Sequence, residues 1–102
     1  MHEAGDCSAA DASSAKGHFN PQGMKHGHHH HGERHAGDLP NLVADAQGRA
    51  VYKAEVKGLK LATGADGILG RSVVVHADPD DYQSQPAGNS GARQACGVIQ
   101  AL

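Results

Sequence analysis

The first 38 residues of the chain carry histidines in a defined frame, yet they lack the hydrophobic periodicity of a helix or a strand. His18, His26, His35 and Asp38 are spaced by eight, nine and three residues. Three imidazoles and a carboxylate make a complete tetrahedral zinc shell. A long segment without regular structure needs an organiser, and a bound metal ion can replace the missing apolar core. The frame therefore predicts a metal-binding loop.

The composition allows one small domain with a thin core. Of 102 residues, 16 are Val, Leu, Ile or Phe, which marks a weak core-former, and 14 glycines favour turns. The net charge of −2 with neutral histidines does not indicate nucleic acid or an anionic membrane surface as a partner. No apolar run approaches the ~18 residues of a membrane span. We expect neither nucleic acid nor membrane partners.

Strand patterns begin after residue 38. Residues 41–45 predict a short strand, residues 46–48 a turn, and residues 49–56 a strand with period-two alternation, so the three segments predict a hairpin. Residues 72–76 predict an apolar strand that ends in a histidine, and residues 95–99 a last short strand. Residues 78–91 are loop-like, with room for a small helix at 79–83. The pattern predicts an all-β chain with two long loops and no internal repeat.

Three motifs of this chain are typical of one family. They are GHFNP at residues 17–21, RSVVVHADPDD at 71–81 and GNSGARQACGVI at 88–99. Together with the histidine frame, they resemble the Cu,Zn superoxide dismutases, most closely the bacterial, periplasmic type. The resemblance covers nearly the whole chain but only the later part of the family's pattern. It implies an all-β fold, a partial Greek-key β-barrel or sandwich with long metal-binding loops.

The resemblance implies two cofactors, Zn²⁺ and Cu²⁺, which share one ligand. His18 resembles the family's histidine whose imidazolate bridges copper and zinc. The implied zinc ligands are His18, His26, His35 and Asp38, and the implied copper ligands are His2, His18 and His76. The family's copper site has a His-x-His pair, of which this chain has only the second member. The first copper-ligand histidine and the first strands of the barrel are thus expected to be missing.

The resemblance also implies a reaction, the conversion of superoxide to oxygen and hydrogen peroxide. Copper would alternate between Cu(II) and Cu(I), oxidising one superoxide and reducing the next. Arg93 resembles the active-site arginine that attracts and orients superoxide, and His18 would carry a proton to the departing peroxide. Asp80 resembles the carboxylate that fixes the tautomers of the ligand histidines. Plainer interpretations are a solvated charge for Arg93 and a backbone-bonded core histidine for His76.

Two cysteines, Cys7 and Cys96, lie 89 positions apart and could be free thiols. The resemblance implies that they form the family's intrasubunit disulfide. Such a bond would indicate an oxidising, extracytoplasmic compartment such as the periplasm, although this chain contains no signal-peptide pattern.

The run of four histidines, His28, His29, His30 and His31, has no place in the family's ligand pattern. A purification tag is one interpretation, but tags stand at termini and this run is internal. An auxiliary site for Zn²⁺ or Cu²⁺ is another. The run also offers alternative ligands that could shift the register of the metal site.

We therefore expect a single partial domain. Its parts are a disulfide and zinc loop at 1–40, strands at 41–76, an electrostatic-type loop at 77–94 and the last strand at 95–102. One predicted function is a truncated antioxidant superoxide dismutase that turns over superoxide poorly as an isolated chain. The alternative is a non-catalytic His-rich zinc- and copper-binding module. Because missing strands leave open edges, we expect a homo-oligomer or complementing strands from another chain.

Overall fold

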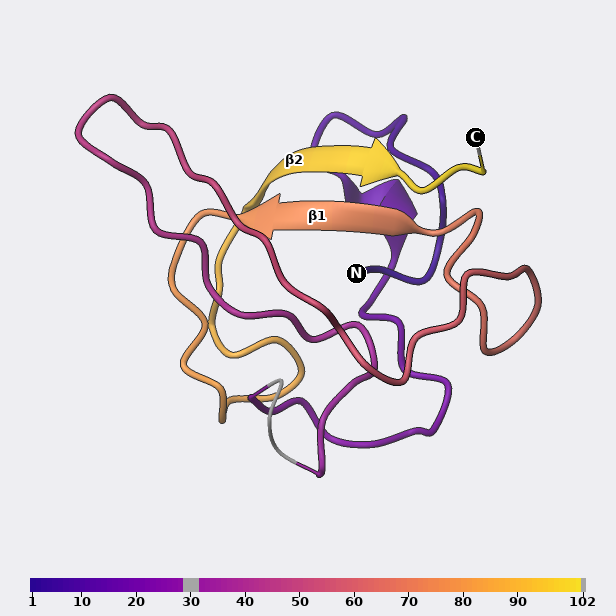
Figure 1. Cartoon of the computed structure of the whole chain (residues 1–102). Coiled ribbons are helices and arrows are strands. Elements are labelled where there is room, and N and C mark those ends of the chain that lie inside the picture. The colour runs from indigo at the N-terminus through magenta and orange to yellow at the C-terminus, as the bar shows by residue number, and fades with distance from the viewer. Residues whose placement is uncertain (29–31, 102) are drawn as a thin grey trace.

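A computed structural model of the chain describes residues 1–28 and 32–101. Its regular elements in these ranges are a 3₁₀ helix, η1 (Ser13–Ala15), and two strands, β1 (Ser72–His76) and β2 (Arg93–Val98). The strands pair antiparallel as a two-stranded sheet, with an irregularity in register at the end of β1 (Figure 1). The described ranges contain no helix long and apolar enough to cross a membrane. Loops and turns therefore make up most of the molecule.

Two of the strand predictions are confirmed. The Val-rich strand lies at residues 72–76 as expected, and the last strand, expected at 95–99, is β2 at Arg93–Val98. In the sheet, Val74 lies opposite Cys96, and His76 lies opposite Arg93. The register thus brings the histidine at the end of β1 beside the arginine at the start of β2.

The hairpin predicted for residues 41–56 is wrong. Its turn forms, because the Gly48 N–H donates to the Asp45 carbonyl and the Asp45 N–H donates to the Arg49 carbonyl. Beyond this turn neither arm is a strand, and the tip of the segment projects beyond the sheet (Figure 1). Val43 and Val51 are 85% and 80% exposed. A two-stranded hairpin is marginal in water unless it packs on a further surface, and no strand of the described ranges pairs with either arm.

The small helix expected at 79–83 is also absent from the structure. The Asp80 carboxylate accepts a hydrogen bond from the Tyr82 N–H, and the Asp81 carboxylate accepts hydrogen bonds from the Gln83 and Ser84 N–H groups. Aspartate side chains that bond nearby backbone groups offer an alternative to the helix. The segment is therefore a tight turn held by its own side chains.

The amino-terminal segment lies between β1 and the loop at residue 18. His2 exchanges backbone hydrogen bonds with Ser72, and the Phe19 N–H donates to the Met1 carbonyl. A disulfide joins Cys7 to Cys96 and so links this segment to β2. The first residues of the chain are thereby hydrogen-bonded to β1 on one side and to the loop at residue 18 on the other.

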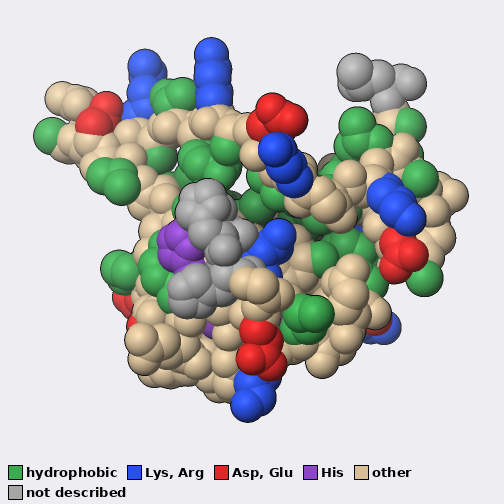
Figure 2. Space-filling view, turned by 60° about the horizontal axis from the view of Figure 1, so that its bottom comes forward, with side chains coloured by type: hydrophobic (Ala, Val, Ile, Leu, Met, Phe, Trp, Pro, Cys, Tyr) green, Lys and Arg blue, Asp and Glu red, His purple; other side chains and the backbone are tan. Residues whose placement is uncertain are grey.

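The interior of the described part is more polar than apolar. Buried apolar side chains are Ala12, Ala15, Phe19 and Ile68, whereas the buried polar ones are His2, His26, His35, Asp38, Ser72 and Ser90. Figure 2 shows apolar side chains exposed on the projecting segment. Imidazoles and carboxylates thus occupy the place of a conventional core.

One arginine links several loops to this interior. The Arg71 guanidinium lies 4.2 Å above the centroid of the Phe19 ring. It also donates hydrogen bonds to four backbone carbonyls, those of Glu3, Gly64, Ala65 and Gly67. These hydrogen bonds tie residues 3 and 64–67 to the residue that precedes β1.

Candidate metal centre

Two groups of metal-ligand side chains meet at one histidine. The first contains His18, His26, His35 and Asp38, and the second contains His2, His18 and His76. Within each group, one ligand atom from every residue lies within 4.8 Å of all the others. The structure therefore brings together both ligand sets that the sequence resemblance implies.

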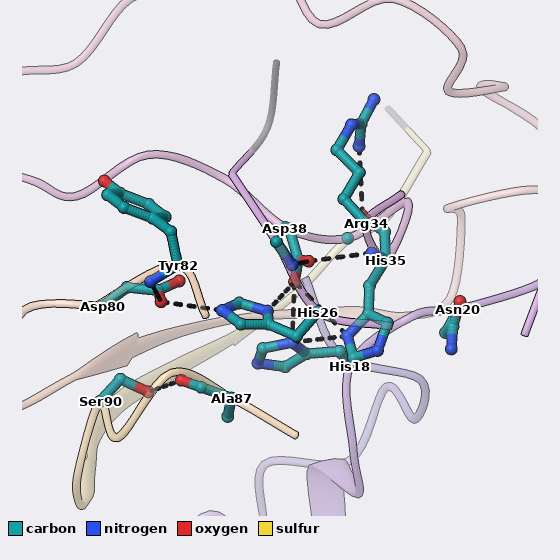
Figure 3. Close-up of polar contacts among 12 residues, drawn as sticks. His18, Asn20, His26, Arg34, His35, Asp38, Asp80, Tyr82, Ala87 and Ser90 are labelled. Carbon is teal, nitrogen blue, oxygen red and sulfur yellow. Dashed lines mark hydrogen bonds and ion pairs between the residues drawn. The ribbon is translucent and has the colours of Figure 1, made fainter. Parts of the chain in front are cut away.

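The four-residue group converges on Asp38 (Figure 3). Its Oδ1 atom lies 2.9 Å from the His18 Nδ1 atom, 2.8 Å from the His26 Nδ1 atom and 3.5 Å from the His35 Nδ1 atom. The His18 and His35 Nδ1 atoms are 3.0 Å apart. Bonds of about 2.0–2.1 Å around a tetrahedral zinc ion place neighbouring ligand atoms about 3.3 Å apart. The observed separations are close to that value.

Two buried atoms of this group support a metal ion directly. The His26 Nδ1 and Asp38 Oδ1 atoms are buried, and neither makes a hydrogen bond of good geometry to a described residue, although they lie 2.8 Å apart. Buried polar atoms without a partner are costly. A cation between the two atoms would satisfy both, so the side chains present fit Zn²⁺.

The Asp38 carboxylate is held in its charged form. Burial raises its pKa, but the close approach of the His18 ring and the hydrogen bond from the Gly27 N–H outweigh burial and lower the pKa to about 2. The Oδ2 atom accepts hydrogen bonds from the backbone N–H groups of Gly27 and His35 at 3.1 and 2.9 Å. The backbone thus occupies one oxygen and leaves the other, Oδ1, facing the histidines.

Asp80 fixes the ring of His26 from behind. Its Oδ1 atom lies 2.8 Å from the His26 Nε2 atom. Burial lowers the pKa of His26, but Asp80 and Asp38 more than offset this effect, and the pKa is raised. A hydrogen bond from Nε2–H to the carboxylate leaves the Nδ1 lone pair available to a metal. Asp80 reaches the zinc-type group as expected.

In the second group, the rings of His2 and His76 face each other. The His2 and His76 Nε2 atoms are 3.2 Å apart, and their Nδ1 atoms lie 2.7 Å from the Lys16 carbonyl and 3.3 Å from the Gly91 carbonyl, respectively. Burial lowers the pKa of His2 to about 3 and also lowers the pKa of His76. Backbone carbonyls thus fix both rings with an Nε2 lone pair directed inward.

Arg93 lies beside this second group. Its guanidinium donates a hydrogen bond of 2.9 Å to the Ala12 carbonyl, which fixes the side chain. Burial is the main cause of the lowered pKa of His2 and His76, the hydrogen bonds to backbone carbonyls act against it, and the positive charge of Arg93 adds a smaller lowering. The structure thus places a positive charge near the predicted copper ligands.

The histidine run is only partly described. The His28 ring lies 4.5 Å from the Tyr82 ring, in an edge-on arrangement, while residues 29–31 lie outside the described ranges. The sequence reasoning missed Gln85, which bonds the backbone of His26, and the Lys16 and Gly91 carbonyls. A loop glutamine and a backbone carbonyl leave no recognisable signal in a sequence.

Comparisons with known proteins agree with this geometry. The family described as copper/zinc superoxide dismutase (SODC) matches residues 1–99. Superoxide dismutase (Cu-Zn) 2 of Aquifex aeolicus (strain VF5) is 44% identical over 104 residues, which cover 98% of this chain and 61% of the relative. Superoxide dismutase (Cu-Zn) of Deinococcus radiodurans is 46% identical over 93 residues, covering 87% of this chain and 50% of the relative.

Solved structures extend the match to the fold. The crystal structure of the clock protein EA4 has a TM-score of 0.88 and 41% identity, covering 99% of this chain and 67% of that one. The crystal structure of a SOD-like protein from Bacillus subtilis has a TM-score of 0.86 and 37% identity, covering 96% and 68%. The expected all-β class is confirmed at this level. The chain spans 61% and 50% of the two curated relatives above, and it belongs to the copper/zinc superoxide dismutase family.

Proposed function

We propose that this chain is part of a Cu,Zn superoxide dismutase, an oxidoreductase that converts superoxide to oxygen and hydrogen peroxide. One observation carries the proposal: His18 belongs both to a four-residue group with a carboxylate and to a group of three histidines. Only imidazole among side chains offers two nitrogens to two metal ions. The His18 Nδ1 atom lies in the four-residue group, which leaves Nε2 for the other.

The residues then take distinct roles. His18, His26, His35 and Asp38 hold Zn²⁺, and His2, His18 and His76 hold Cu²⁺. When bound, copper supplies one-electron redox chemistry. Arg93 would attract the superoxide anion toward this group and orient it. The His18 Nε2 atom, when it is not bound to copper, would hold the proton that leaves with peroxide.

A second candidate function follows from the copper-type group. It holds three histidines in the described ranges, whereas the zinc-type group is a full set of four ligands. The isolated chain would then bind zinc well and dismutate superoxide poorly. This is the non-catalytic zinc- and copper-binding module. The auxiliary role of His28–His31 stays a prediction.

A groove beside β1 supports the addition of a further strand. It has a volume of about 520 Å³ and lies between residues 39–52 and β1, with Leu42, Tyr52, Val73 and Val75 in its lining. The outer edge of β1 carries an antiparallel bridge from His2 to Ser72, with no other pairing to a described residue. An extended strand in this groove could come from a second copy or another chain. It would extend the single domain of residues 1–102 toward a Greek-key barrel.

The cysteines indicate the cellular compartment in which the protein resides. The Cys7–Cys96 disulfide favours an oxidising location outside the cytoplasm, such as a periplasm.

The experiment that tests the proposal loads the chain with zinc and then copper. Asp38→Ala should weaken zinc binding at least about 10-fold, because a charged, buried ligand is lost. Asp45→Ala, at an exposed turn, is the matched control. Copper should give an electron paramagnetic resonance spectrum with imidazole nitrogen coupling that changes in His76→Gln. Copper binding that His76→Gln leaves unchanged would contradict the assignment.

A stopped-flow superoxide assay separates the two candidate functions. The copper-loaded chain should accelerate superoxide decay above free-metal controls if the dismutase function holds in this chain. No acceleration, with both metals bound, would favour the binding module.

A further inference from the structure

The backbone of His26 is held by the side chain of a glutamine 59 residues away. The Gln85 Oε1 atom accepts a hydrogen bond from the His26 N–H at 2.7 Å, and the Gln85 Nε2 atom donates one to the His26 carbonyl at 2.9 Å. In the described ranges, neither backbone group of His26 makes a backbone–backbone hydrogen bond. One side-chain amide therefore provides what a neighbouring strand would normally provide.

The loop that carries Gln85 is itself well fixed. The Asp81 Oδ1 atom accepts hydrogen bonds from the Gln83 and Ser84 N–H groups at 2.9 and 2.8 Å. The Gly88 N–H donates to the Ser84 carbonyl at 2.7 Å, and the Asp81 N–H donates to the Gly88 carbonyl at 3.0 Å. The Gln85 amide also donates to the Gln83 carbonyl at 3.0 Å. Hydrogen bonds within the loop itself thus hold Gln85 in place, in addition to its bonds with His26.

His26 is consequently held at two ends. Asp80 bonds the far nitrogen of its ring, and Gln85 bonds its backbone on both sides of the Cα atom. The His26 side chain is fully buried, and its Nδ1 atom lies 2.8 Å from the Asp38 Oδ1 atom. Asp80 fixes the orientation of the imidazole ring, whereas Gln85 fixes the position of the backbone from which the side chain extends. Both must be correct for Nδ1 to reach the metal position.

We propose that Gln85 is a positioning residue of the zinc site, which places His26 through its backbone without touching the metal. The inference rests on the proposed zinc site and deepens it. Removing an outer partner of a ligand typically lowers metal affinity by about 10–100-fold. Because Asp80 would remain in place, we expect loss of the Gln85 amide to fall near about 10-fold.

Three variants of the full chain test this role. Gln85→Met keeps the length of the side chain and removes both hydrogen bonds. Gln85→Glu keeps the acceptor for the His26 N–H and removes the donor to its carbonyl. Gln83→Met is the matched control, because Gln83 is an exposed neighbour, and the side-chain amide that bonds the His26 backbone belongs to Gln85. Zinc affinity is measured by competition with a chromogenic chelator.

Two further readouts report geometry. The visible spectrum of Co²⁺ bound in place of zinc reports the arrangement of the ligands, and amide exchange reports the His26 N–H. We expect the parent and Gln83→Met to bind zinc equally, with Gln85→Glu weaker and Gln85→Met weakest. The cobalt spectrum should change and the His26 amide should exchange faster in Gln85→Met. A role in folding alone would leave the cobalt spectrum of the folded fraction unchanged.

Parental zinc affinity and cobalt spectrum in Gln85→Met would overturn the proposal. An equal loss in Gln83→Met would also overturn it, since the effect would then belong to the loop in general. If Gln85→Met fails to form the Cys7–Cys96 disulfide, Gln85→Glu decides, and parental affinity in that variant overturns the proposal. Failure of the parent chain to bind zinc is a different result, which would overturn the zinc site itself.

Discussion

The metal-ligand loops and the projecting segment at 41–56 behave in opposite ways. The loops show no hydrophobic periodicity, yet His26, His35 and Asp38 are buried, and imidazole nitrogens lie 2.8–2.9 Å from the Asp38 carboxylate. The projecting segment has the clearest period-two alternation of the chain, yet its arms form no strand and its valines are exposed. Directional polar contacts order the first region, whereas the apolar pattern of the second lacks a surface to pack on.

Hydrophobic periodicity alone is therefore a conditional indication of a strand. A strand pattern predicts which face of a segment would be buried. That face becomes buried only when another element of the protein packs on it. Ligand spacing is less conditional, because residues of the same chain supply all four members of the zinc-type group. We therefore expect the two regions to respond separately to substitutions and to acid.

The largest effect is expected from removing the disulfide. Closing a loop of this length stabilises a chain by about 4–5 kcal/mol in the chain-entropy model, and Cys7–Cys96 has an 89-residue separation. Cys96→Ser should therefore unfold much of the amino-terminal segment and raise amide exchange around His2. Exchange in residues 41–56 should stay as fast as before. Unchanged protection around His2 would contradict the prediction.

Acid should affect the metal-ligand loops more than the projecting segment. The pKa of His2 is lowered by burial from 6.5 to about 3 in the folded state. Below pH 6.5 the unfolded chain binds a proton that the folded chain does not, so this contribution to stability is present above pH 6.5 and lost toward about pH 3. The raised pKa of His26 acts in the opposite direction.

Denaturant titration of the metal-free chain across this pH range measures the effect. The free energy of unfolding should fall as the pH falls, and His2→Gln should flatten the dependence. An identical pH dependence in parent and variant would remove His2 as its source.

A methyl group at Gly88 should disturb the zinc-type group at intermediate cost. A Cβ atom there would lie 1.9 Å from the Asp80 Oδ1 atom and 2.9 Å from the His26 Nε2 atom. Gly88→Ala should separate this pair and destabilise the chain by about 1–3 kcal/mol. Gly23→Ala is the matched control, since Gly23 has nearly the same φ, +64° against +65°, and nothing within 4 Å.

Equal effects of the two glycine variants on zinc affinity and denaturation would attribute the cost to backbone strain. A larger effect of Gly88→Ala on zinc affinity and on denaturation would attribute the cost to the contact with Asp80.

The smallest effect is expected in the projecting segment. Val43→Ser and Val51→Ser should each change the free energy of unfolding by less than about 0.5 kcal/mol, because both side chains are already exposed. Thermal denaturation of the monomer measures this. A loss above about 1 kcal/mol would show that the hairpin forms in solution and packs on the molecule.

The residues of the candidate site could be predicted from the sequence more accurately than the strands could. The spacing of His18, His26 and His35 singled out side chains that the structure brings together, because ligand types and intervals survive in a loop. The strand ending at His76 was predictable from its valines. The projecting arms and the role of Gln85 were not, since one depends on a missing surface and the other on a backbone contact.

Arg71 has a consequence for the acid-treated chain. Its guanidinium keeps its charge at every pH at which a protein is studied, and the carbonyls and Phe19 ring that it contacts do not titrate. Protonation of the imidazoles would therefore expand the molecule unevenly. A compact remnant that joins residues 3, 19 and 64–67 around Arg71 should outlast the metal-ligand loops and serve as the nucleus on which they reassemble when the acid is neutralised.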